Sequence, residues 1–184
     1  MKFESLAIAD VKLITPRKFG DDRGFFSETW TERAMADAGV VGHFVQDNQA
    51  FSSENSTVRG LHFQLPPMAQ GKLVRVTRGA ILDVAVDIRR SSLTFGRHVT
   101  AVLSAENWSQ LWVPQGFAHG YCTILPDTEV IYKVTEYYSP AHDRGIQWDD
   151  PALGIAWPVT RTTAQLSGKD KMQPPLAGAP LLFE

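Results

Sequence analysis

Short stretches of alternating hydrophobic and polar residues run along most of the chain, with Gly, Pro, Ser, Asn or Asp between them. They are rich in β-branched and aromatic residues, which is typical of strands. This pattern predicts strands over residues 58–65, 72–88, 97–103, 109–114, 118–125 and 128–138. Many short strands at this spacing favour an all-β sandwich or barrel.

Two segments depart from the strand pattern. WTERAMADAG, residues 30–39, predicts a short helix, with Thr31 as its N-cap and Gly39 as its stop signal. KMQPPLAGAP, residues 171–180, is rich in Pro and Gly, and we expect it to lie on the surface without regular structure.

Size and composition indicate an ordinary globular protein. The chain has 184 residues, of which 43% are hydrophobic and 21% charged, so we expect one domain over residues 1–184. A net charge of -2 gives no electrostatic reason to expect nucleic acid or an anionic membrane as partner. No apolar run is long enough to span a bilayer, and acidic residues interrupt the N-terminal apolar stretch. The single cysteine, Cys122, suits a reducing cytoplasm.

Polar side chains inside the strands are informative because a buried strand tolerates few of them. By alternation, five of them share strand faces with apolar neighbours and would converge in one cavity if those faces line a barrel interior: His62, Gln64, Lys72, His119 and Tyr132. Each alone has a plainer interpretation, such as a core histidine with satisfied hydrogen bonds, a lysine that reaches solvent, or a tyrosine at the rim. Their occurrence on separate strands favours a functional cavity.

A metal site is the main competing interpretation. GLHFQ and PQGFAHG look like degraded forms of the two cupin motifs, in which an H-x-H pair, an acid and a later histidine hold a metal. Here Gln64 replaces the second histidine, and LPPMAQGK has no Glu at the expected spacing. Two imidazoles without a carboxylate or thiolate make a poor zinc or iron site, and Lys72 adds positive charge. We therefore expect no metal.

Ten motifs over residues 19–170 occur in the order found in one enzyme family: FGDDRGFFSE, FVQDN, RGLHFQ, GKLVRV, DVAVDIR, SAEN, WVPQGFAHG, YKVTEYYSP, GIQWDDPALGIAWP and LSGKD. The chain therefore resembles the dTDP-4-dehydrorhamnose 3,5-epimerases. The resemblance implies a cupin-type jelly roll with a few short helices, a homodimer, and activity without metal or organic cofactor. It also implies a dTDP-4-keto-6-deoxy sugar as substrate.

The resemblance assigns catalytic roles to four residues. It implies that His62 is the base, whose ordinary pKa of about 6.5 suits proton transfer near neutrality. Asp170 would orient the imidazole, Lys72 would hold the enolate oxygen, and Tyr132 would return the proton to the opposite face. Without the resemblance, Asp170 would be interpreted as a turn or helix-cap residue.

The same comparison assigns residues to substrate binding. Arg23 and Arg59 resemble diphosphate contacts, and Tyr138 is suited to stacking on thymine. The other matching positions are Glu28, Gln46, Asp47, Asn48, His119, Asp143 and Lys169. Surface ion pairs and a turn are the plainer interpretations of Arg23, Glu28 and the QDN run. Strict alternation places Arg59 opposite His62, so both reach one cavity only if the strand kinks, and Gly60 is the candidate position.

Two features leave the exact function open. Asp143 stands where the family usually carries Glu, which puts its contact with the nucleotide in doubt. Related enzymes invert only carbon 3 or only carbon 5, or move the keto group, and the shared motifs do not separate them. The hypotheses, in falling order, are the double epimerase, a metal-dependent cupin and a non-catalytic sugar-nucleotide binder. The N-terminal arm of the family reaches the neighbouring subunit, so Arg23 and Glu28 would contact substrate bound by the other chain.

Overall fold

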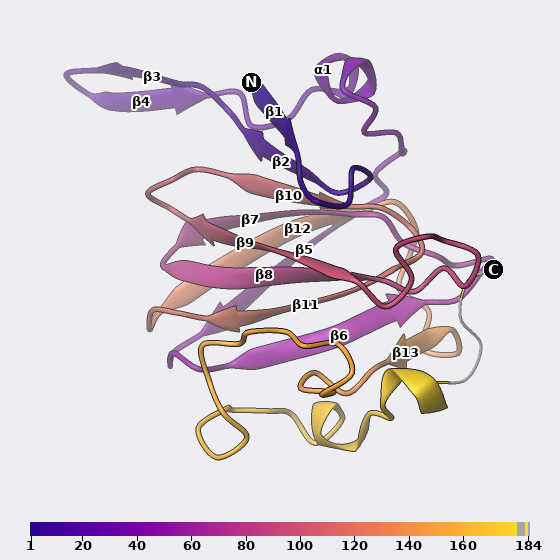
Figure 1. Ribbon diagram of the computed structural model, residues 1–184. Helices are drawn as coiled ribbons and strands as arrows, with labels where there is room; N and C mark the ends of the chain where they lie inside the picture. The colour runs from indigo at the N-terminus through magenta and orange to yellow at the C-terminus, as the bar shows by residue number, and fades with distance from the viewer. Residues whose placement is uncertain (180–182, 184) are drawn as a thin grey trace.

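Two antiparallel sheets stack face to face in a computed structural model that describes residues 1–179 and 183 (Figure 1). The first sheet has six strands, in the order β1 (Lys2–Ser5), β2 (Lys12–Thr15), β10 (Gln110–Val113), β7 (Lys72–Arg78), β12 (Thr128–Val134) and β5 (Gln46–Ser52). The second has five, in the order β13 (Asp143–Gly145), β6 (Val58–Gln64), β11 (Phe117–Thr123), β8 (Ala80–Asp87) and β9 (His98–Ser104). Neighbouring strands are often distant in sequence, as in a jelly roll.

The remaining elements lie outside the two sheets. A separate hairpin, β3 (Lys18–Asp21) and β4 (Gly24–Ser27), projects from the body, as Figure 1 shows, and α1 (Glu32–Asp37) follows it in the chain. Thr31 caps α1 by accepting a hydrogen bond from Ala34 N at 3.4 Å, and Gly39 follows the helix with φ of 76°, so the predicted helix is confirmed. The C-terminal stretch has two short 3-10 helices, η1 (Asp170–Met172) and η2 (Leu176–Gly178), where no regular structure was expected.

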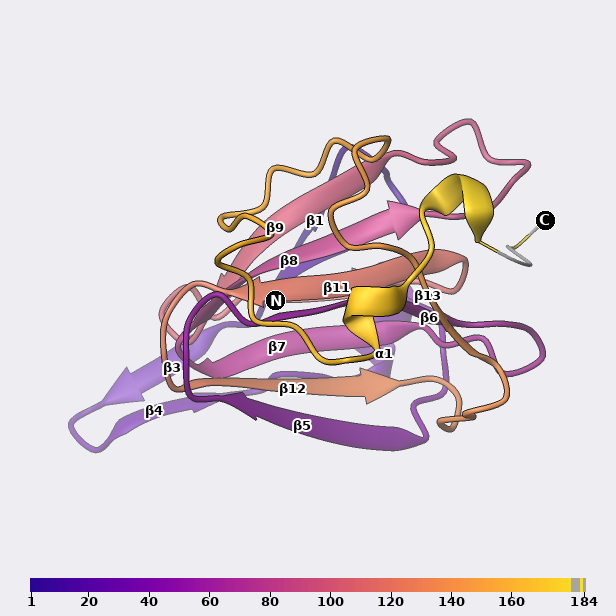
Figure 2. The same ribbon diagram turned by 90° about the horizontal axis from the view of Figure 1, so that it is seen from below.

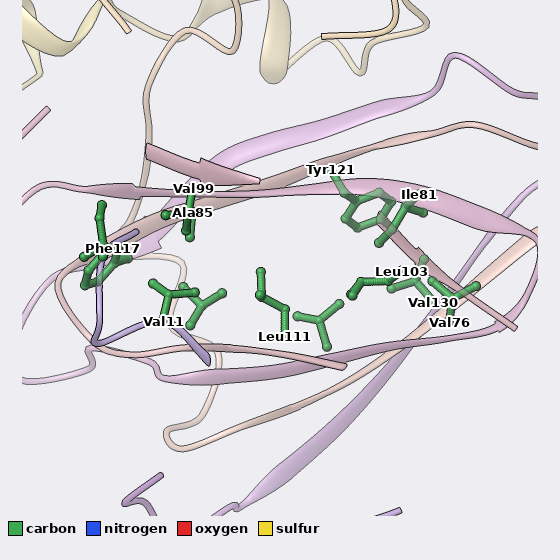
Figure 3. Close-up of a cluster of buried hydrophobic side chains, with 13 residues drawn as sticks. Val11, Val76, Ile81, Ala85, Val99, Leu103, Leu111, Phe117, Tyr121 and Val130 are labelled. Atoms are coloured by element: carbon green, nitrogen blue, oxygen red, sulfur yellow. The ribbon is translucent and has the colours of Figure 1, made fainter. Parts of the chain in front are cut away.

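The main hydrophobic core fills the space between the two sheets (Figure 3). Alternation points Val74 and Val76 of β7 and Val130 of β12 into this core, where each is at most 2% exposed. The same alternation points Lys72 and Tyr132 to the inner side of the sheet, as predicted. The predicted strand over residues 72–88 is instead two strands, because Gly79, with φ of 78°, turns the chain into the second sheet.

The central strands β8 and β11 of the five-stranded sheet are buried on both faces. Its outer face packs under the C-terminal segment, which runs along β6 in Figures 1 and 2, through a cluster that includes Leu61, Phe63 and Ile146. This double burial explains why β8 and β11 are almost continuously apolar. A polar side chain on these strands therefore needs a partner within the protein. Among the described residues, no helix is long and apolar enough to cross a membrane.

Candidate active site

A polar cavity lies between the two sheets, next to the apolar core. Its outer chamber, of about 350 Å³, is lined by Gln46, Asn48, His62, Phe63, Gln64, Gln70, Lys72, Tyr132, Tyr138, Asp143 and Lys169. Its inner chamber, of about 250 Å³, is lined by Ala50, Arg59, His62, Lys72, His119, Tyr121, Tyr132, Ser167 and Asp170. His62, Lys72 and Tyr132 line both chambers, so they stand where the chambers meet.

His62 forms a dyad with Asp170. Its Nε2 lies 2.5 Å from Oδ1 of Asp170, which η1 brings against β6 from 108 residues away. Asp170 is 4% exposed and also accepts a hydrogen bond from the Ser167 hydroxyl at 2.8 Å. Burial alone would raise the pKa of Asp170, but the bonds to His62 and Ser167 outweigh it and the pKa is lowered. The carboxylate therefore stays ionised and fixes the orientation of the imidazole.

A bulge in β6 brings Arg59 into the same chamber as His62. On β11, His119 pairs with His62 and Tyr121 pairs with Arg59, so three steps along β6 match two along β11. The bulge contains Gly60, whose φ is 131°. A Cβ atom at this position would lie 2.5 Å from the Cα of Gly120, so only glycine fits. The kink predicted at Gly60 is thus confirmed, and both side chains line the inner chamber.

A second His–Asp pair lies beside the first and was not predicted. Nε2 of His119 is 2.6 Å from Oδ1 of Asp83 on β8, and Asp83 is fully buried. The sequence signal was present in ILDVAVDI, where Asp83 interrupts an apolar strand. Within the described part of the chain, the buried Oδ2 of Asp83 and the hydroxyl of Tyr121 have no hydrogen-bond partner. They add unsatisfied polar atoms around the inner chamber.

Lys72 and Tyr132 approach from the opposite sheet. Burial lowers the pKa of Lys72 to about 8, although the carboxylates of Asp143 and Asp83 oppose that shift. Lys72 is therefore an ammonium at neutral pH, close to the dyad. Burial also raises the pKa of Tyr132, and the nearby Arg59 offsets part of this effect. The Tyr132 phenol keeps its proton and can donate it.

The outer chamber carries polar groups suited to a larger ligand. Tyr138 lies at the rim, 56% exposed, and its hydroxyl donates to Asp143 at 3.1 Å. Asp143 also pairs with Lys169. On β5, the Gln46 amide donates to Asn48 at 2.8 Å, and both side chains face the chamber.

Three predicted contacts lie outside the cavity of the single chain. Asp47 lies between Gln46 and Asn48, so alternation sends its carboxylate to the outer face, where it pairs with Lys133 at 2.8 Å. Of the QDN run, Gln46 and Asn48 therefore line the cavity of the single chain and Asp47 does not. Arg23 is in the β3–β4 turn, paired with Asp21, and Glu28 follows β4. The hairpin holds both away from their own cavity.

Among residues 1–179 and 183, no three His, Cys, Asp or Glu side chains are grouped as metal ligands. The Gln64 amide, at the position of the second cupin histidine, is fully engaged with backbone groups. Its Nε2 donates to the carbonyls of Met68 at 2.6 Å and Tyr137 at 3.0 Å, and its Oε1 accepts from Ser139 N at 2.7 Å.

Comparison with known proteins identifies the family. The profile described as dTDP-4-dehydrorhamnose 3,5-epimerase matches residues 5–178. The chain belongs to the dTDP-4-dehydrorhamnose 3,5-epimerase family. A protein of that name from Sinorhizobium fredii is 58% identical over 188 residues, which cover 100% of this chain and 94% of that protein.

Two solved structures resemble this epimerase-family chain closely. The dTDP-4-dehydrorhamnose 3,5-epimerase from Bacillus anthracis, with TDP and PPi bound, has a TM-score of 0.91 at 51% identity, over 95% of this chain and 98% of that one. The dTDP-6-deoxy-D-glucose-3,5-epimerase from Legionella pneumophila, in complex with dTDP-4-keto-L-rhamnose, has a TM-score of 0.91 at 41% identity, over 96% and 93%. The predicted family and all-β, cupin-like fold are confirmed.

Proposed function

We propose that this protein inverts carbons 3 and 5 of dTDP-4-keto-6-deoxy-D-glucose and so forms dTDP-4-dehydro-L-rhamnose in dTDP-L-rhamnose biosynthesis. The observation that carries the proposal is the junction of the two chambers. At that junction, His62 of β6, which is paired with Asp170 of η1, faces Lys72 of β7 and Tyr132 of β12. A base and an acid from facing sheets are what inversion of a carbon centre requires.

The chemistry follows from the ketone at carbon 4. A proton on carbon 3 or carbon 5 is acidic because the electron pair left behind delocalises onto the keto oxygen as an enolate. We assign removal of that proton to His62, whose imidazolium the ionised Asp170 stabilises. We assign stabilisation of the enolate oxygen to the Lys72 ammonium, because a positive charge attracts an anion more strongly in a buried site than in water.

Tyr132 completes the inversion in this scheme. The enolate carbon takes the phenol proton from the face opposite His62, which leaves imidazolium and phenolate. Proton exchange with water then resets both groups. The raised pKa of Tyr132 supports the donor role, because the phenol stays protonated until the enolate forms. None of these steps needs a metal or an organic cofactor.

The remaining predicted residues suit the rest of the substrate. We assign the sugar hydroxyls to His119 in the inner chamber and the diphosphate to Arg59. The outer chamber would hold the nucleotide, with Tyr138 stacked on thymine and Gln46, Asn48, Asp143 and Lys169 as polar contacts. The dTDP-4-keto-L-rhamnose in the Legionella relative supports a dTDP-sugar ligand.

We further propose a cytoplasmic homodimer whose subunits share their sites. The β3–β4 hairpin exposes Phe19, Phe25 and Phe26 by 51%, 54% and 70%, an apolar surface suited to burial against a second subunit. Arg23 and Glu28 would then reach the partner's cavity. The one free cysteine, Cys122, supports a reducing compartment.

Product NMR tests the proposed function directly. Incubation with dTDP-4-keto-6-deoxy-D-glucose should give a product inverted at both carbons. A product inverted at one carbon alone would support the mono-epimerase alternative, and the absence of turnover would contradict epimerase activity.

A further inference from the structure

The segment that carries Tyr138 has no partner strand, and several side chains bind its backbone. Residues 136–139 follow the end of β12 at Val134 and precede β13, so they lie outside every strand. Tyr138 itself is exposed, and its hydroxyl donates a hydrogen bond to Asp143. A loop without strand partners needs other groups to fix its backbone. Three glutamine side chains supply four hydrogen bonds to this backbone. The Tyr137 N–H also donates to the Glu136 carboxylate at 2.8 Å, and the Ser139 carbonyl accepts from the backbone N–H groups of His142 and Asp143 at 3.0 Å.

Gln64 holds this segment on both sides of Tyr138. Its Nε2 donates to the carbonyl of Tyr137 at 3.0 Å, and its Oε1 accepts from the backbone N–H of Ser139 at 2.7 Å. Through its second N–H, Nε2 also donates a hydrogen bond to the carbonyl of Met68 at 2.6 Å. Both amide donors are therefore used, and the side chain is 3% exposed, so little of it is left for a ligand.

Gln46 and Gln70 complete the arrangement. The backbone N–H of Tyr138 donates to Oε1 of Gln46 at 3.2 Å, and Nε2 of Gln70 donates to the carbonyl of Glu136 at 2.7 Å. Three amides from separate parts of the chain thus bind four consecutive residues. All three glutamines also line the outer chamber, so the loop and the cavity wall are fixed together.

We propose that Gln64 is a positioning residue for nucleotide recognition, because it fixes the backbone on either side of Tyr138 and so aims that ring at the base. This proposal rests on the proposed function, in which Tyr138 stacks on thymine. It explains why an amide stands where a metal-binding cupin has its second histidine. An imidazole has no group that can donate twice and accept once, as this amide does.

Gln64→Met is the decisive variant, because methionine keeps the volume and adds no charge but makes none of the three hydrogen bonds. We expect the Kd for dTDP, measured by calorimetry, and the KM for the sugar nucleotide to rise about 10-fold, as for a lost buried hydrogen bond. The kcat should change much less, since the dyad, Lys72 and Tyr132 are untouched. Gln147→Met removes a comparable amide bond, to Asp149 at 3.0 Å, away from the cavity and should leave Kd unchanged.

A double-mutant cycle with Tyr138→Ala separates positioning from general destabilisation. If Gln64 acts through the tyrosine, Gln64→Met should weaken dTDP binding far less in the Tyr138→Ala background than in the wild type. Additive effects, or a fall in kcat equal to the rise in KM, would overturn the proposal while leaving the function intact. If Tyr138→Ala alone does not weaken dTDP binding, the stacking assignment in the proposed function fails, and this positioning role fails with it.

Hydrogen exchange supplies a readout that does not depend on activity. In Gln64→Met, the amide of Ser139 loses its acceptor, so its exchange should accelerate at least about 10-fold relative to distant strand amides. Unchanged exchange at Ser139 would show that Gln64 does not hold the loop, whatever the enzyme does with substrate.

Discussion

His62 and His119 are direct partners across β6 and β11, and each imidazole uses its Nε2 to contact a different buried carboxylate. The distances are 2.5 Å to Asp170 and 2.6 Å to Asp83. Neighbouring strands thus present two oriented imidazoles to one chamber. This arrangement suits proton transfer and hydrogen bonding, because a carboxyl group fixes the orientation of each ring.

The same contacts argue against metal dependence. Gln64, at the position of the second cupin histidine, is engaged with the backbone, and the Lys72 ammonium would repel a cation. We expect chelator-treated enzyme to keep full activity. Elemental analysis should accompany the assay, and stoichiometric metal whose removal abolishes activity would contradict the proton-transfer mechanism.

Asp170→Asn should weaken His62 as a base while leaving nucleotide binding intact. The substitution keeps the shape of the side chain but removes the charge that stabilises the His62 imidazolium. We expect kcat to fall about 10²- to 10⁴-fold, the contribution of a positioned acid–base group, while the Kd for dTDP changes little. Stopped or continuous epimerisation assays and calorimetry measure the two quantities.

Asp150→Asn is the matched control for Asp170. Asp150 is also buried, at 6% exposed, but it accepts hydrogen bonds from the backbone N–H groups of Ala152 and Leu176, away from the cavity. Its loss should lower Tm and leave kcat unchanged. An equal fall in kcat for both variants would mean that Asp170 acts only through stability.

The pH dependence of kcat/KM should follow the ionisation of Lys72. Because burial lowers the pKa of Lys72 to about 8, the ammonium is present below that pH and is lost above it. If it holds the enolate, kcat/KM should decline as pH rises through about 8. Lys72→Arg should be slower but should lose this decline, since a guanidinium stays charged.

Lys133→Arg is the control for Lys72→Arg, because it changes a lysine of the same sheet that lies outside the cavity. Lys133 neighbours Tyr132 on β12 but points to the outer face, where it pairs with Asp47. Its profile should match that of the wild type. A decline near pH 8 that survives in Lys72→Arg would assign the titration to another group.

Subunit complementation tests the shared site. Arg23→Glu removes the contact that the β3–β4 hairpin would make with the partner's substrate, and His62→Ala removes the base from the cavity. Each variant alone should therefore be nearly inactive. When both are co-expressed, half of the dimers are mixed and one of their two sites is intact, which predicts about a quarter of wild-type activity. Recovery beyond the sum of the two variants supports the shared site. No recovery, or a fully active monomer by light scattering, would contradict it.

Alternation predicted the inward face of the six-stranded sheet well, because the buried valines of β7 and β12 stand at every second position. Val74 and Val76 identified the side on which Lys72 lies, and Val130 and Val134 did the same for Tyr132. These features depend on near neighbours in the chain. The kink at Gly60 needed the family resemblance as well, because alternation alone puts Arg59 and His62 on opposite faces and the resemblance placed both at the substrate.

The predictions that depended on distant contacts were less complete. No local pattern pairs Asp170 with His62 across 108 residues, and only the family resemblance suggested it. Asp83 was missed, although a carboxylate inside an apolar strand requires a partner. The QDN motif suggested one contact segment, whereas strand alternation puts Asp47 on the opposite face of β5 from Gln46 and Asn48.

The most direct test of the account separates the base from the acid in deuterated water. His62→Ala should abolish both solvent exchange at the carbon next to the ketone and epimerisation, because nothing removes the proton. Tyr132→Phe removes one oxygen and little volume, so NMR should show exchange that continues while inversion falls about 10²- to 10⁴-fold. Inversion at near wild-type rate in Tyr132→Phe, with exchange persisting in His62→Ala, would contradict the assigned roles.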